Sequence, residues 1–209
     1  MLIPLVDVLR CTKPHDGTWL VASIDRAEDR DILEGMLGCP TCLAEYPIHE
    51  GVVTFESGVT RPEFQQPSEN DVLRLAAALD LVDPRMTVVL HGSWGSCAPY
   101  LRGVAPVALI LVNPPEGIAS GDGISIILSS TAPIAVSAVN AVAVDAGASD
   151  TMVASLTRSL RAGGRMVGPS GMTLPDNLVE IARDDDLWVA RLDTVVTVSA
   201  PILPTRRTR

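Results

Sequence analysis

Short apolar runs separated by polar turns dominate the second half of the chain. Four of these runs, at residues 87–91, 107–112, 124–128 and 141–144, are rich in Val, Ile, Leu and Ala and almost free of charge. A strand without polar alternation is buried on both faces of its sheet, as in parallel sheets that helices cover. A fifth strand is expected to start at residue 165. The pattern therefore predicts an α/β fold with a mostly parallel sheet.

Helical periodicity lies between and beside these strands. Apolar residues recur at spacings of three and four over residues 69–81 and 150–161. We expect Asp150 to be the N-cap of the second helix and Gly163-Gly164 to end it. The remaining elements predicted in this half are a helix and two closing strands, at residues 175–183, 187–192 and 194–200.

The N-terminal segment, residues 1–57, shows a different, β-rich pattern, in which we predict a strand at 18–24 and a short acidic helix at 27–37. Residues 58–69 are polar, contain two prolines and show no periodicity. The predicted organisation is therefore a small β-rich unit at 1–57, a linker at 58–69, and a reduced Rossmann-like unit at 70–209.

Three of the four cysteines lie close to the start of the chain. The segment Cys39-Pro40-Thr41-Cys42 places two thiols on one side of a tight turn, where both can reach one Zn²⁺. Cys11 and His15, four positions apart, would complete an S₃N site. We therefore predict a zinc ion held by these four side chains, with free thiols and a surface histidine as the alternative. A redox role is less favoured, because no helix is expected after the motif.

The chain is acidic, with 25 Asp and Glu against 16 Lys and Arg and a formal net charge of −9. Phosphate binding needs clustered Lys and Arg, so this balance argues against nucleic acid as a partner. The one basic cluster along the sequence is Arg206-Arg207-Thr208-Arg209. As alternatives, this cluster is a solvated terminus or a contact for an acidic partner or RNA.

Residues 1–10 lack the basic region and cleavage site of a signal peptide, and the thiols have metal-ligand spacing, so we expect a cytoplasmic protein. The uncharged run 124–144 is interrupted by Pro133 and Asn140. We expect it to form two buried strands, and no membrane insertion is predicted.

Three blocks near the start carry a family resemblance: Leu9-Arg10-Cys11, Gly38-Cys39-Pro40-Thr41-Cys42, and Tyr46-Pro47-Ile48 followed by Gly51-Val52. Over roughly 1–56 the chain resembles the small zinc-ribbon family whose members activate tRNA and protein methyltransferases as a bound partner. Pro14 stands where that family usually has a second cysteine, so His15 would replace it as a ligand.

Later segments resemble a second family. Asn140-Ala141-Val142-Ala143-Val144-Asp145 is similar to the fourth strand of class I S-adenosylmethionine-dependent methyltransferases. Leu160-Arg161-Ala162-Gly163-Gly164-Arg165-Met166-Val167 is similar to the segment that leads into their fifth strand. The resemblance implies S-adenosylmethionine as cofactor, at the carboxyl ends of the strands. The residues that would line its pocket are Gly92, Gly95, Asn113 and Asp145.

The cofactor segments depart from that family's pattern. Trp94 stands at the second glycine position of the first loop, Leu90 at the usual acid, and Asn113 where the second strand usually ends in an acid. About ten residues separate the second and third predicted strands, which is too short for a covering helix. One face of the sheet is therefore thinly covered, or something else covers it.

We favour a zinc-binding, methyltransferase-like protein that has lost catalysis and serves as a structural or regulatory subunit, bound to a protein partner or to copies of itself. Its ribbon would dock a partner or its own second unit. The alternative is an active S-adenosylmethionine-dependent methyltransferase acting on a small molecule, protein or RNA. His91 or Asp145 would then be the base. The sequence leaves the partner, the substrate and the oligomeric state open.

Overall fold

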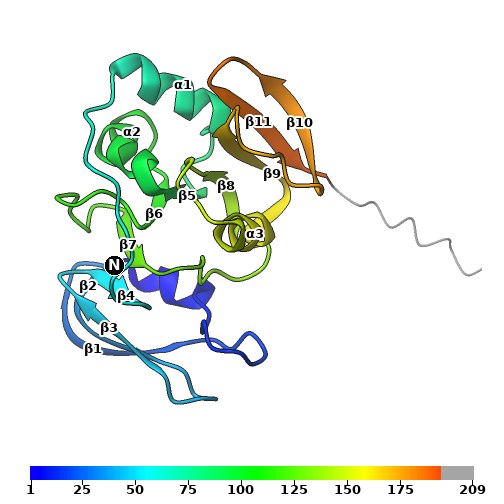
Figure 1. Ribbon diagram of the computed structural model, residues 1–209. Helices are drawn as coiled ribbons and strands as arrows, with labels where there is room; N and C mark the ends of the chain where they lie inside the picture. Colours follow the sequence, from blue (N-terminus) through cyan, green and yellow to red (C-terminus); the bar gives the residue numbers. More distant parts are fainter. Residues whose placement is uncertain (194–209) are drawn as a thin grey trace, which may run out of the picture.

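The computed structural model describes residues 1–193, which form a single sheet of eleven strands with helices on both faces (Figure 1). The strand predicted at 194–200 lies outside the described residues. The order across the sheet is β1-β2-β3-β4-β7-β6-β5-β8-β9-β11-β10. The centre of the sheet, from β4 to β9, is parallel, and its two ends are antiparallel.

The second half of the chain forms a Rossmann-like arrangement. Its strands are β5 (Thr87–His91), β6 (Ala108–Val112), β7 (Ile124–Leu128), β8 (Val139–Ala143), β9 (Leu160–Pro169), β10 (Leu178–Arg183) and β11 (Leu187–Leu192). Counted from β5, the first five lie in the order 3-2-1-4-5 that doubly wound folds share. After them β11 pairs antiparallel with β9, and β10 with β11. The predicted class, a β-rich N-terminal part with a mostly parallel Rossmann-like sheet, is confirmed.

The N-terminal segment 1–56, which we call the ribbon, extends this sheet. It contains the 3₁₀ helix η1 (Ile3–Val8) and the strands β1 (Val21–Glu28), β2 (Asp31–Gly38), β3 (Glu45–His49) and β4 (Val52–Thr54). The four strands form an antiparallel meander, and β4 then pairs parallel with β7. The ribbon therefore docks on the chain's own second half. Residues 57–68 form no helix or strand, and the division into two units stays a prediction.

Different parts of the chain cover the two faces of the sheet. On one face α1 (Glu69–Leu79) and α2 (Ala98–Val104) pack on the even-numbered residues Val88 and Leu90 of β5 and their neighbours. The other face carries Val89, together with α3 (Asp150–Ser159) and buried residues of η1 and of the ribbon strands. The short crossover between β6 and β7 thus leaves a face that the ribbon covers.

Several predicted elements were wrong in type or in position. Residues 27–37 are a hairpin of β1 and β2, because Asp29 takes the left-handed conformation (φ 51°) and turns the chain back on itself. Residues 175–183 hold strand β10, because pairing with β11 overrides the helical spacing. The N-cap of α3 is Ser149, whose hydroxyl accepts a hydrogen bond from the Met152 amide. Gly163 lies within β9 and does not end the helix.

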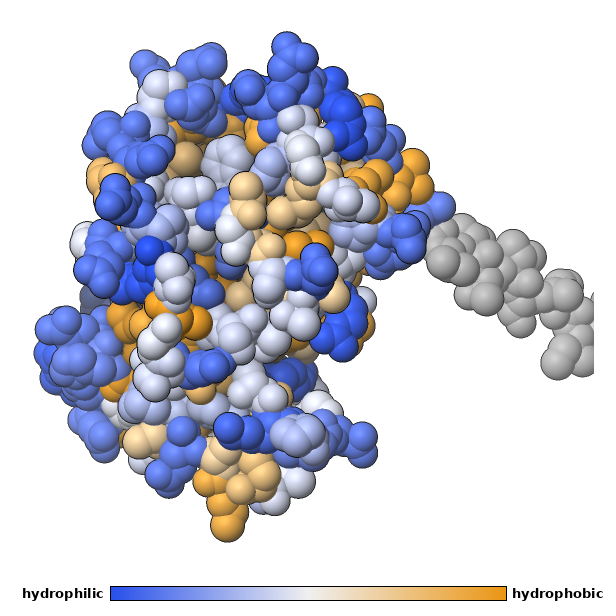
Figure 2. Space-filling view, in the orientation of Figure 1, coloured by the Kyte–Doolittle hydropathy of each residue, from blue (hydrophilic) through white to orange (hydrophobic). Residues whose placement is uncertain are grey.

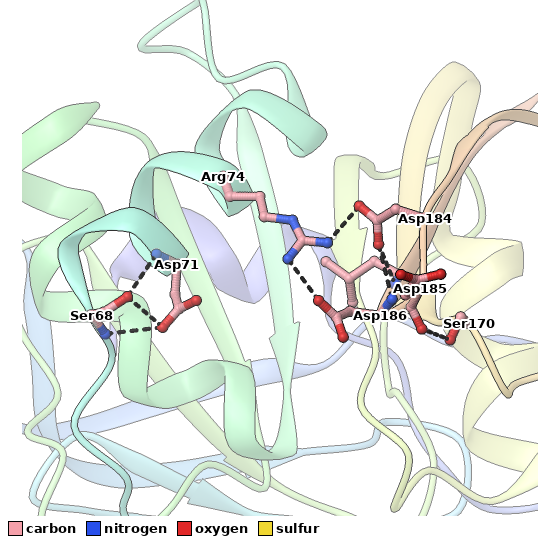
Figure 3. A network of polar contacts seen from close by, with 8 residues as sticks. Ser68, Asp71, Arg74, Ser170, Asp184, Asp185 and Asp186 are labelled. Atoms are coloured by element: carbon pink, nitrogen blue, oxygen red, sulfur yellow. Dashed lines mark hydrogen bonds and ion pairs between the residues drawn. The ribbon is translucent and has the colours of Figure 1, made fainter.

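The acidic run Asp184-Asp185-Asp186 forms the turn between β10 and β11. Arg74 of α1 reaches across and pairs with Asp184 and Asp186 (Figure 3). The Asp184 carboxylate also accepts hydrogen bonds from the Asp186 and Leu187 amides, which hold the pKa of Asp184 below its usual value together with the Arg74 guanidinium. The turn is therefore tied to α1.

Residues 124–144 form β7, a loop and β8, as expected. In the described part of the chain no helix reaches the length and hydropathy that a membrane span requires.

Candidate metal centre and strand-end crevice

Four side chains from two loops converge at one end of the ribbon. Cys11 and His15 belong to the loop between η1 and β1, and Cys39 and Cys42 to the turn between β2 and β3. Their ligand atoms all lie within 4.8 Å of one another. Cys11 Sγ is 3.6 Å from Cys42 Sγ, and Cys39 Sγ is 3.5 Å from His15 Nε2. A tetrahedral zinc ion would separate two sulfurs by about 3.8 Å, and sulfur from nitrogen by about 3.5 Å. The four residues predicted as ligands thus fit a metal ion of this size.

The His15 ring is oriented for coordination. Its Nδ1 lies 2.7 Å from the main-chain oxygen of Asp16. A carbonyl oxygen only accepts hydrogen bonds, so Nδ1 carries the proton and Nε2, on the side of Cys39, keeps its lone pair. Fixing the tautomer through the second nitrogen is a common feature of metal-bound histidines. Asp16 thus supports His15 through its main-chain carbonyl.

Hydrogen bonds and burial shift the pKa values of the three thiols. Burial opposes ionisation of Cys11, but the Tyr46 hydroxyl, 3.0 Å from Cys11 Sγ, and the Lys13 amide outweigh it and lower the pKa of that thiol. At Cys39 burial is likewise outweighed by main-chain amides of the turn, and its pKa is lowered. At Cys42 the hydrogen bond from the Ala44 amide lowers the pKa of the thiol, but desolvation and the neighbouring thiols outweigh it, so that the pKa is raised. Two of the three sulfurs are thus prepared to bind a cation as thiolates.

A crevice lies at the carboxyl ends of β5, β6 and β8, where ligands bind in doubly wound sheets. Its volume is about 320 Å³, at the lower end of the range for small-molecule sites. The residues that line it are Thr60, Pro62, His91, Asn113, Ser130, Asp145, Gly147, Ser149 and Met152. Asn113 and Asp145, two of the predicted cofactor residues, therefore share one cavity.

Asp145 follows β8, and its carboxylate contacts the loop that follows β5. Its Oδ2 accepts a hydrogen bond from the Ser93 amide at 2.7 Å, and its Oδ1 lies 3.0 Å from His91 Nδ1 and 3.1 Å from the Gly147 amide. Burial alone would raise the pKa of Asp145, but His91 and the Ser93 amide outweigh it and lower that pKa. Gly92 has φ +60°, and a Cβ added there would overlap the Asp145 carboxylate. The close approach at Gly92 is therefore made by the protein's own side chain.

Trp94 turns toward the sheet. Its Nε1 donates a hydrogen bond to the main-chain oxygen of Val144 at 3.1 Å, at the end of β8. One face of this indole contacts a second cavity of about 320 Å³, which Arg74 and Asp186 also line. Gly95, the remaining predicted cofactor residue, packs against Pro114: a Cβ added to it would lie 2.6 Å from the Pro114 Cβ. Gly95 is not among the residues that line the crevice.

Asn113 uses its amide within the protein. Its Nδ2 donates to the main-chain oxygen of Ser129 at 2.7 Å, and its Oδ1 accepts from the Ser129 amide at 3.0 Å. Both residues are buried, and Asn113 has φ 52°, a conformation that asparagine tolerates better than most residues. The side chain thus links the end of β6 to the end of β7, and its polar groups are already occupied.

The segment after β4 crosses the crevice as a strap. Arg61 donates from Nε to the Pro114 oxygen at 2.6 Å and from Nη2 to the Pro115 oxygen at 2.9 Å. Thr60 and Pro62, on either side of it, line the crevice. No sequence pattern indicated this strap, or the contacts of Trp94 and Ser129, because each joins residues far apart in the chain. Tyr46, by contrast, was visible in the Tyr-Pro-Ile block.

No protein-family model and no curated protein matches this sequence. Among solved structures, a geranyl diphosphate methyltransferase in complex with GPP and sinefungin aligns at a TM-score of 0.41 and 20% identity, over 47% of this chain and 44% of that protein. Phosphoethanolamine N-methyltransferase 2 of Haemonchus contortus aligns at 0.42 and 11% identity, over 52% and 30%. The [4+2]-cyclase SpnF aligns at 0.43 and 13%, over 58% and 53%.

The alignments span about half or less of these proteins' own length. At TM-scores below 0.5 they establish neither a family nor an activity, and the description of the fold rests on the strand order and pairing given above.

Proposed function

We propose that the chain is a zinc-binding, methyltransferase-like protein whose strand-end crevice does not take S-adenosylmethionine, and that it acts as a structural or regulatory subunit of a complex. The observation that carries this proposal is the hydrogen bond that the Ser93 amide donates to the Asp145 carboxylate. In the resembled family the loop after the first strand approaches the cofactor with its main chain. Here that loop already holds an anion that belongs to the protein.

Three further contacts support a closed crevice. The Asn113 amide is committed to Ser129, the Trp94 ring is fixed to β8, and Arg61 holds the strap on the Pro114 and Pro115 carbonyls. Binding of S-adenosylmethionine would require several of these hydrogen bonds to break. The two Asn113–Ser129 bonds are buried, and each buried group left unsatisfied costs about 1–3 kcal/mol. The complex would form with a protein partner or between copies of the chain.

Zinc is the ion that we assign to the metal centre. Three sulfurs and one imidazole at tetrahedral spacing are a typical structural zinc set, and four protein ligands leave no position for substrate. When bound, zinc would hold the η1–β1 loop against the β2–β3 turn. Its role would be to stabilise the ribbon that covers one face of the sheet.

The second candidate function, an S-adenosylmethionine-dependent methyltransferase, is favoured by the crevice itself. His91 contacts the Asp145 carboxylate and lines the cavity. An ionised carboxylate accepts a hydrogen bond from Nδ1–H, and the other nitrogen of a neutral imidazole is then free to take a proton from a substrate. This arrangement would suit a general base if the strap and Trp94 moved.

The deciding experiment is isothermal titration of the zinc-loaded protein with S-adenosylmethionine and S-adenosylhomocysteine. We expect no binding up to 1 mM ligand, which corresponds to about −4 kcal/mol. The Asp145→Ala variant, which frees the Ser93 amide, is titrated in parallel, and Asp176→Ala at an exposed turn serves as the control. Micromolar binding to the unmodified protein would overturn the closed-crevice proposal in favour of the second candidate.

The subunit role has a separate test. Light scattering on the purified protein measures its mass in solution, and affinity capture at native expression levels identifies stable partners. A monomer that captures no stoichiometric partner would contradict the subunit role, whatever the titration shows.

A further inference from the structure

A cavity of about 720 Å³ lies between the metal-bearing loop and α3. Cys11, His15 and Trp19 line it on one side, and the segment 131–136 and Arg158, in the last turn of α3, line it on the other. In the space-filling view the surface is notched at this level, below α3 and above the loop (Figure 2). We refer to this cavity as the junction groove.

Positively charged side chains from distant parts of the sequence lie together in the junction groove. Arg10, Lys13 and Arg158 line it, and none of the described residues that line it is an Asp or a Glu. Acidic residues outnumber basic ones in the chain, 25 to 16. Six other arginines form ion pairs with carboxylates: Arg26, Arg74, Arg85, Arg102, Arg165 and Arg183. The three cations of the groove form no ion pair within residues 1–193.

The Arg10 side chain keeps a binding edge open. Its Nη1 donates to the main-chain oxygens of Asp7 and Leu9, which fixes the guanidinium. Its Nε and Nη2 have no hydrogen-bond partner in the described part of the chain. This pair of parallel N–H groups is the edge that binds phosphate or carboxylate in a bidentate manner.

An aromatic ring accompanies this edge. The Arg10 guanidinium lies over the Trp19 ring, 3.9 Å from its centroid, yet Trp19 is still 61% exposed. An indole with a guanidinium on one side and much of its surface open is a platform on which a planar ring can stack.

The groove is held in shape by the main chain. The Arg10 amide donates to the Pro133 oxygen at 2.9 Å, and the Ala135 amide donates to the Val8 oxygen at 2.8 Å. These two bonds fix the floor of the groove to the wall that carries Arg10. A site whose walls are already in place loses less entropy on binding.

From these features we propose that the junction groove binds a nucleotide, with the phosphates on Arg10, Lys13 and Arg158 and the base stacked on Trp19. Three unpaired cations outweigh the single net negative charge of a zinc ion held by three thiolates and one imidazole, so the groove still attracts the phosphates of a nucleoside diphosphate. The volume lies within the usual range for small-molecule sites. A long nucleic acid is disfavoured, because its many phosphates would meet the net charge of −9 beyond the groove. An acidic peptide could use the cations but would leave the exposed indole without a planar partner.

The test is isothermal titration of the zinc-loaded, full-length protein with ADP at low salt, without added magnesium. We expect a 1:1 complex in the micromolar range. Arg10→Gln and Arg158→Gln should each weaken binding roughly tenfold, since each removes one charge-assisted contact. Trp19→Leu should weaken it several-fold. Arg30→Gln removes an exposed arginine outside the groove and should leave the affinity unchanged.

Each result supports or overturns the assignment. No binding at 1 mM ADP, or binding that survives Arg10→Gln and Arg158→Gln together, would overturn the site. Pyrophosphate binding as tightly as ADP, with Trp19→Leu without effect, would overturn the nucleotide, as would displacement of ADP by a hexaglutamate peptide at lower concentration. If Arg10→Gln loses zinc or unfolds, Lys13→Gln with Arg158→Gln replaces it, because neither side chain contacts another described side chain by hydrogen bond.

Discussion

Replacing Asn113 by Ala tests whether its side chain, at the end of β6, stabilises the fold or is free to bind a ligand. The side chain makes two hydrogen bonds, of 2.7 and 3.0 Å, to the buried main chain of Ser129. Their loss leaves an N–H and a C=O buried without these partners, at about 1–3 kcal/mol each. Alanine at φ 52° adds about 1 kcal/mol of backbone strain. We therefore expect Asn113→Ala to lower the free energy of unfolding by about 5 kcal/mol.

Urea unfolding followed by far-UV circular dichroism measures this loss. Asn113→Gly removes the same hydrogen bonds but tolerates the left-handed backbone, so it should cost about 1 kcal/mol less than Asn113→Ala. Asn177→Ala, at an exposed turn, is the matched control and should stay within about 0.5 kcal/mol of the unmodified protein. A loss below about 1 kcal/mol for Asn113→Ala would refute the reasoning and leave the amide free for a ligand.

Three further predictions concern the metal, the Asp145 carboxylate and the packing of β9. The double variant Cys39→Ser, Cys42→Ser should release about one zinc per chain and lower the melting temperature, measured by metal analysis and calorimetry. Asp145→Asn should be about 1–2 kcal/mol less stable at pH 7. Since folding lowers the Asp145 pKa, this stabilisation is present above the ordinary aspartate pKa and is lost as the pH falls below about 4. Gly168→Ala should cost about 1–3 kcal/mol and alter near-UV circular dichroism, because its Cβ would overlap the buried Trp188 ring.

Controls accompany these three predictions. Cys97→Ser removes a buried thiol outside the metal cluster and should keep the zinc, and Gly171→Ala places a Cβ where no atom lies within 4 Å. Stoichiometric zinc in the double variant would contradict the metal centre. An Asp145→Asn deficit that is no smaller at pH 3 than at pH 7 would contradict the carboxylate's role. An unchanged Trp188 signal in Gly168→Ala would contradict the packing.

The central strands could be predicted because strands that are buried on both faces have unbroken apolar sequences. Residues 87–91 and 124–128 form strands within the predicted bounds. Residues 27–37 were misassigned, because Leu33 and Leu37 satisfy a helical spacing while a turn at Asp29 pairs the segment with β1. Local propensity cannot decide such cases when a partner strand provides the stabilisation.

The metal cluster could be predicted because Cys39 and Cys42 lie in one turn and Cys11 and His15 in one loop, so the spacing within each pair is a local property. The crevice could not, because its closure depends on contacts between distant parts of the chain. Asp145 and Ser93 are separated by 52 positions and Arg61 and Pro114 by 53. The junction groove could not be predicted for the same reason: its cations come from residues 10, 13 and 158 and form no cluster along the sequence.

The pairing of β4 with β7 has a consequence for aggregation. Strand β7 reads Ile-Ser-Ile-Ile-Leu and carries no charge, no proline and no bulge, which natural sheets use to protect an exposed edge. The short strand β4, Val52–Thr54, supplies that protection. A chain that begins at residue 58 would present β7 as an open, apolar edge able to recruit strands from other molecules. The ribbon thus also covers the apolar edge of β7.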